Sequence, residues 1–212
     1  MRRVFGLSVI VMAFIVGSSS ALAATSQRIT LKAVIGQGSW EMYDEDTGSG
    51  EFGDLQFATA EGKTTVSLSM SSGELVLCEG GDTPDESDDF YGFVGTETYG
   101  QGVGRMTVGK TYSSAVASGT VDAEVYSYDE CTGDEGTVTS KKIAVSLDLT
   151  GVSPVITEKV RSTITIPQRL RSKTMIQAQS REAAGSLKVG TRTIEVGGII
   201  GQLQMRGSLT TR

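Results

Sequence analysis

Residues 121–149, VDAEVYSYDECTGDEGTVTSKKIAVSLDL, decide the fold of this chain. Apolar side chains occupy every second position of residues 121–125, and again of residues 143–149 after a short acidic loop. Alternation with a period of two is typical of a β-strand that buries one face and exposes the other to water. The stretch therefore predicts a long β-hairpin in the middle of a sheet.

The same alternation recurs along the chain, for example in residues 29–35, 66–70 and 155–166. We expect a single all-β domain over residues 24–212, an antiparallel β-sandwich of about ten to twelve strands. A closed β-barrel is the alternative. Residues 71–73 and the glycine-rich residues 99–104 are interpreted as turns between separate strands. Residues 168–184 have a proline before and a glycine after them, as a helix would, but their alternation favours a strand.

The first 23 residues have the organisation of a secretory signal peptide. Arg2 and Arg3 precede an apolar run over residues 4–16, and small residues stand at Ala21 and Ala23. The apolar run is shorter than the ~20 residues that a membrane-spanning helix needs. We expect cleavage after Ala23, a secreted extracellular protein, and no transmembrane anchor in the mature chain.

Cys78 and Cys131 are the two cysteines of the chain. In an exported protein an even set of two cysteines has one possible pairing, so we expect a Cys78–Cys131 disulfide. The closed loop has 54 residues counting both ends. The chain-entropy model gives about 4 kcal/mol of stabilisation for a loop of that length.

Charge is distributed unevenly along the chain. Residues 24–140 contain 5 basic and 21 acidic side chains, whereas residues 141–212 contain 12 basic and 4 acidic ones. We expect the two segments to face each other on neighbouring strands, where opposite charges favour pairing.

The chain contains no histidine, which excludes Ser-His-Asp and Cys-His mechanisms and histidine-bearing zinc sites. Catalysis by a pair of carboxylates stays possible, as in glycosidases. Glu41, Glu124 and Asp148 lie on expected strands, but no spacing selects a pair, so no catalytic residue is predicted.

The acidic loops contain the hard oxygen ligands that Ca²⁺ prefers. No loop matches an EF-hand, and solvated loops that keep the protein soluble are the alternative interpretation. A rise in thermal stability with Ca²⁺ over chelator would reveal such a site; no other cofactor is expected. The candidate ligands are Asp82, Asp85, Asp88, Asp89, Asp129, Glu130, Asp134 and Glu135.

Several aromatic residues could contact a glycan if they are exposed, above all Tyr91 and Tyr126. The basic C-terminal third lacks interleaved aromatic residues and the whole chain is acidic, which argues against nucleic acid as a partner. A glycan or another surface protein remains as the partner class.

Three segments carry a resemblance to known proteins: DECTG at 129–133, IAVSLDLTG at 143–151 and SREA at 180–183. In these segments the chain resembles a set of uncharacterised exported bacterial all-β proteins. The resemblance implies export and β-architecture, and it implies no activity and no site residues.

Together these patterns predict an exported, non-catalytic binding or cell-surface module of unknown ligand, with a Ca²⁺ site in its acidic loops as an open possibility. The alternatives are a carboxylate-dependent glycan hydrolase and a β-barrel that binds a small apolar ligand.

Overall fold

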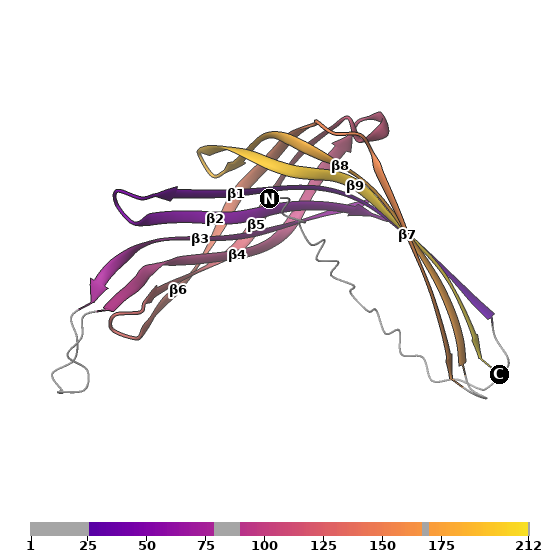
Figure 1. The fold of residues 1–212 in the computed structure, drawn as a ribbon, viewed down its shortest axis with the longest axis horizontal. Helices are drawn as coiled ribbons and strands as arrows, with labels where there is room; N and C mark the ends of the chain where they lie inside the picture. The colour runs from indigo at the N-terminus through magenta and orange to yellow at the C-terminus, as the bar shows by residue number, and fades with distance from the viewer. Residues whose placement is uncertain (1–25, 79–89, 167–169, 212) are drawn as a thin grey trace.

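The computed structural model describes residues 26–78, 90–166 and 170–211. These residues form nine β-strands and one short 3-10 helix, η1 (Figure 1). The signal-peptide prediction concerns residues that lie outside this part of the chain. The elements are β1 (Ser26–Asp44), β2 (Ser49–Ala60), β3 (Lys63–Cys78), β4 (Phe90–Val108), η1 (Lys110–Tyr112), β5 (Ser114–Asp129), β6 (Asp134–Gly151), β7 (Ile156–Ile166), β8 (Leu170–Val189) and β9 (Arg192–Thr211).

All nine strands belong to one antiparallel sheet, in the order β6-β5-β4-β3-β2-β1-β9-β8-β7. The second half of β8 also pairs with β6, from Val145 opposite Val189 to Gly151 opposite Ala183. The sheet curls over its own inner face: a Cβ added to Gly38 of β1 would lie 3.0 Å from Leu147 Cδ1 of β6. The all-β prediction is confirmed, with one continuous antiparallel sheet enclosing the core.

The hairpin predicted at 121–149 consists of β5 and β6, paired from Ser114 opposite Thr150 to Asp129 opposite Asp134. Its alternation divides the side chains as expected. The buried side chains are Val121, Ala123, Ile143, Val145, Leu147 and Leu149, while Asp122 and Glu124 are exposed. The buried residues join one core cluster with Phe57, Leu187 and Ile200.

The described residues contain nine strands and not the expected ten to twelve, because segments read as separate strands are continuous. The expected turns at 71–73 and 99–104 lie inside β3 and β4. Their glycines occur where the backbones of adjacent strands approach closely. Gly73 is paired with Gly95, and a Cβ on Gly95 would lie 2.8 Å from the Gly73 Cα.

The residues of 168–184 that the structure describes belong to strand β8, as their alternation indicated. β8 pairs with β9 along its whole length, but its first half pairs with β7 and its second half with β6. β7, residues 170–180 of β8, residues 201–211 of β9 and the first residues of β1 therefore form a four-stranded extension of the sheet, which projects at the right of Figure 1.

The predicted disulfide is confirmed: Cys78 at the end of β3 is bonded to Cys131 in the β5–β6 loop, with 5.2 Å between their Cα atoms. Main-chain contacts support the same junction, since Glu130 N donates to Phe93 O at 3.2 Å. A disulfide accords with the extracellular location that we expect. Within the described residues, no helix has the length and apolar character to cross a membrane.

Candidate anion-binding site

Basic residues gather on one face of the extension. Residues directly opposite each other in a sheet, and those two positions along a strand, share a face. By this rule the register places seven cations on the face that continues the inner face of the sheet, and all seven side chains are exposed. This set, called the basic face below, consists of Arg28, Lys32, Lys159, Arg161, Arg171, Lys173 and Arg206.

The cations of the basic face are separated by uncharged polar residues. One row across the four strands runs Arg28, Ser208, Lys173, Thr163; a second row runs Thr30, Arg206, Met175, Arg161. In the row beyond, two glutamines separate Lys32 from Lys159. Because like charges directly opposite each other destabilise a sheet, this alternation lets the strands carry many cations.

No carboxylate of the described residues forms a salt bridge with these cations. The nearest acidic residue on β7, Glu158, is paired with Ala178 and so belongs to the opposite face. Salt bridges between described residues involve only Lys142 with Asp122 and Arg192 with Glu51, both outside the extension. The expectation that basic and acidic segments face each other therefore holds at these two pairs, and the basic face has no such partner.

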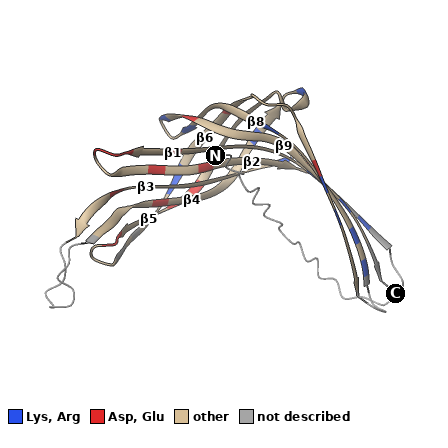
Figure 2. Cartoon of the chain, in the orientation of Figure 1, with Lys and Arg blue, Asp and Glu red and all other residues tan. Residues whose placement is uncertain are grey.

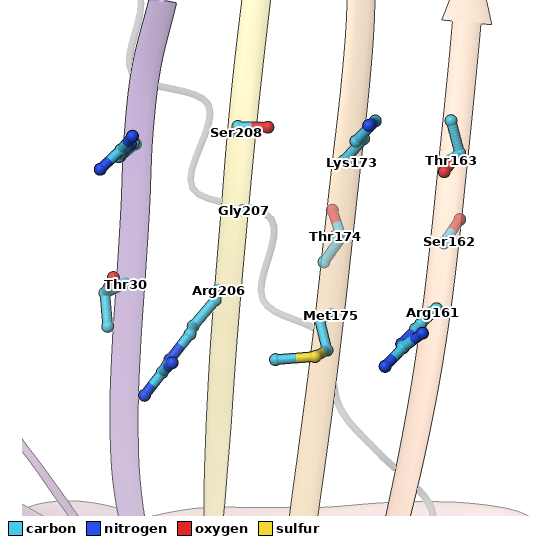
Figure 3. A pocket seen from close by; sticks show the side chains of 11 residues that line it. Thr30, Arg161, Ser162, Thr163, Lys173, Thr174, Met175, Arg206, Gly207 and Ser208 are labelled. Atoms are coloured by element: carbon cyan, nitrogen blue, oxygen red, sulfur yellow. The ribbon is translucent and has the colours of Figure 1, made fainter.

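The centre of the basic face forms an open hollow of about 600 Å³. Arg28, Arg161, Lys173 and Arg206 line it together with Thr30, Thr163 and Ser208. In Figure 3, Arg206 reaches from β9 toward β1, and Arg161 reaches from β7 toward β8. Guanidinium and ammonium groups that line one hollow, with hydroxyls between them, can hydrogen-bond a ligand that presents several anionic groups.

A polar junction connects the basic face to the core. Tyr112 OH donates to Gln179 Oε1 at 3.2 Å, and burial raises the pKa of Tyr112, so its hydroxyl stays protonated at neutral pH. Gln179 Nε2 in turn reaches Thr157 Oγ1 at 3.5 Å. Two residues further along β8, Arg181 lies opposite Ile200 of the core. The Nε atom of Arg181 is buried without a hydrogen-bond partner among the described residues.

The acidic loops have a structural role that the sequence interpretation missed. In DEDTG at 44–48 and DECTG at 129–133, the leading Asp Oδ1 accepts from the main-chain N–H groups two and three residues later. The closing glycine has a positive φ, 66° for Gly48 and 71° for Gly133. The repeated D-E-x-T-G pattern is a turn in which Asp caps the chain reversal.

The predicted calcium ligands are not brought together in the described part of the chain, where no three His, Cys, Asp or Glu residues could hold a metal ion. Asp129 caps the turn, and Glu130 Oε2 accepts from Phe93 N at 2.8 Å. The side chains of Asp134 and Glu135, and the whole of Asp82, Asp85, Asp88 and Asp89, lie outside the described residues. The calcium site stays a prediction.

The carboxylates considered for catalysis are exposed and lie apart. Glu124 is paired with Ser140, which is eight residues from Asp148 along β6. At about 3.3 Å per residue this separation is roughly 26 Å, beyond the roughly 5–10 Å of a glycosidase pair. Glu124 also accepts a hydrogen bond from Tyr126.

The aromatic residues separate into buried and exposed groups. Trp40 is buried and donates to Glu51 Oε1 at 2.9 Å. Tyr91 is 68% exposed and lies opposite the exposed Leu77. Tyr126 packs edge-on against Tyr99. Tyr91 and Tyr99 are on β4 and Tyr126 is on β5, while Trp40 is on β1 but buried and eight residues from Lys32, so none of these rings belongs to the basic face.

Comparison with known proteins gives no relative: no protein-family model, no curated protein and no solved structure matches this chain. The candidate site therefore rests on geometry. The shared face of Arg171 and Lys173 was visible in the alternation of β8. Their neighbourhood with Arg28 and Arg206 was not, because these residues come from opposite ends of the chain.

Proposed function

We propose that this protein is a non-catalytic binding module that holds an anionic polysaccharide on its basic face. The observation that carries the proposal is the alternation of seven exposed cations with uncharged polar residues, without a carboxylate on that face. A chain of sugar sulfates or carboxylates presents repeated anionic groups separated by hydroxyls, which matches such a surface.

The composition of the face favours a glycan over nucleic acid. Proteins that bind single strands combine cations with aromatic rings on which the bases stack. Across the four strands, the register positions of this face from Arg28 to Lys32 contain Ser, Thr, Gln and Met between the cations, and no aromatic residue. Hydroxyl and amide groups hydrogen-bond sugar hydroxyls and offer nothing to a base stack.

Binding of dextran sulfate, measured by calorimetry at low and high salt with uncharged dextran as the comparison, tests the proposal. We expect binding at low ionic strength that weakens as salt screens the charges, and no binding of dextran. The double variant Lys173→Glu/Arg206→Glu should lose roughly tenfold or more in affinity, a change of about 1.4 kcal/mol or more.

The matched control is Lys110→Glu/Lys188→Glu, which makes the same change in net charge at two exposed lysines outside the basic face. It should bind dextran sulfate nearly as the wild type does. An equal loss in both variants would show that net charge alone governs binding. Tighter binding of single-stranded DNA than of dextran sulfate would overturn the assignment to a glycan.

A further inference from the structure

The outer edge of the extension is strand β7, which pairs with another described strand along one side alone. β7 pairs with β8 from Ile156 to Ile166, and no other described strand pairs with it. An edge strand presents a row of main-chain N–H and C=O groups that can pair with another strand. The exposed side chains of β7 alternate between polar residues on the basic face and apolar residues, such as Val160 and Ile164, on the opposite face.

The opposite face of the extension carries an apolar row that reaches this edge. Leu31, Met205, Ile176 and Val160 lie directly opposite one another across the four strands. Val160 and Ile164 at the end of the sheet are each 59% exposed. Exposed apolar side chains on an unpaired edge are a feature that natural sheets normally avoid unless a partner covers them.

We infer that the partner is a second copy of this chain, paired antiparallel through β7 about a two-fold axis at Ser162. In that register Lys159 lies opposite Thr165, Arg161 opposite Thr163, and Val160 opposite Ile164. Each cation meets a threonine and Val160 meets Ile164, while Glu158 lies opposite Ile166 at the end of the paired segment. The alternation of the residues around Ser162 therefore continues across the junction.

The neighbouring registers are disfavoured by charge, by face or by a shorter paired segment. A shift by two positions toward Ile166 opposes no like charges, but it shortens the described pairing from residues 158–166 to residues 160–166. A shift by two positions in the other direction places Arg161 opposite its own copy, and a further shift places Lys159 opposite Arg161; both oppose like charges. A shift by one position exchanges the two faces of the strand and brings cations beside apolar residues. A two-fold axis perpendicular to the sheet keeps both basic faces on the same side, so the dimer doubles the basic surface.

A cysteine at the axis tests the register in the full protein. Both native cysteines are joined to each other, so Ser162→Cys introduces the single free thiol. Directly opposed residues in antiparallel strands lie about 4.5–5.5 Å apart, within the range that a disulfide spans. We expect Ser162→Cys to oxidise to a covalent dimer. In Thr165→Cys the two thiols would lie six residues, roughly 20 Å, apart along the strands, and that variant should stay unlinked.

Light scattering after size exclusion gives the independent measurement. The mass should rise with protein concentration to two chains and no further. Val160→Lys, which places a charge in the apolar row at the edge, should remain at one chain. Val103→Lys, a matched change at a 75% exposed valine on β4, should keep the dimer. A single-chain mass at every concentration, masses above two chains, or equal cross-linking of both cysteine variants would overturn the inference.

Discussion

At the scale of single residues, glycine has two different uses in this protein. In the D-E-x-T-G turns it supplies a positive φ at Gly48 and Gly133. Inside β3 and β4, glycine leaves room where the backbones of adjacent strands approach closely, as at Gly73 and Gly95. A glycine in a sequence signals both, and the second use explains why residues 99–104 are strand and not turn.

A pair of glycine substitutions tests this distinction. We expect Gly95→Ala to destabilise the protein by about 1–3 kcal/mol, as overpacked sites do, because the new Cβ would meet Ser72 O and the Gly73 Cα. Gly197→Ala in β9 meets no atom within 4 Å. It should be neutral or stabilise by up to about 1 kcal/mol. Urea unfolding of both variants measures the difference, and equal effects would contradict the close-approach explanation.

At the scale of elements, the β3 end and the β5–β6 loop are held as one unit. The disulfide joins them, Gly92 of β4 lies against it, and a Cβ there would come within 2.7 Å of Cys78 Sγ. The D-E-x-T-G turn places Cys131 for this bond, because Asp129 fixes the main chain at residues 131 and 132.

Removal of the disulfide should therefore lower stability without changing the fold. For the double variant Cys78→Ala/Cys131→Ala we expect the free energy of unfolding to fall by about 4 kcal/mol, because the two cysteines are 53 residues apart in the sequence and their bond closes a long loop. Urea unfolding measures the loss, and far-ultraviolet circular dichroism should retain its β-sheet spectrum. Reduction of the wild type should reproduce the effect, and an unchanged unfolding midpoint would show that the bond constrains little.

At the scale of the whole molecule, positive and negative charge are separated in space. Figure 2 shows Lys and Arg along the extension, while Asp and Glu gather on the far tips of β1, β2 and β5. The chain has a net charge of −6 at pH 7. The net charge governs the field far from the protein, whereas contact with a ligand depends on the local surface, and here a local surface has the opposite sign.

The charge separation predicts an unusual chromatographic behaviour. A sequence pI of about 4.8 taken alone would predict that a cation-exchange resin repels the protein at pH 7. We expect retention at low salt through the basic face, and elution as salt shortens the screening length to below about 10 Å. Lys173→Glu/Arg206→Glu should flow through, whereas Lys110→Glu/Lys188→Glu should be retained. Flow-through of the wild type would contradict a locally positive surface.

The features of the fold that could be predicted from the sequence are those that depend on residues close together in the chain. The alternation at 121–149 determined the β5–β6 hairpin and its buried parity, and the alternation at 168–184 determined the strand character of β8, because strand periodicity is local. Two cysteines in one chain determined their own pairing. The acidic turns were present in the sequence as D-E-x-T-G, but the main-chain caps that Asp44 and Asp129 form are visible only in the hydrogen bonds of the folded chain.

Only the tertiary structure decided where the cations meet. The sequence by itself determined which residues of β1, β7, β8 and β9 share a face within each strand. The cross-strand register joins Arg28 from the start of the chain to Lys173 and Arg206 near its end. That register depends on how distant strands of the sheet pair around the common core, a non-local packing problem whose solution no single segment contains.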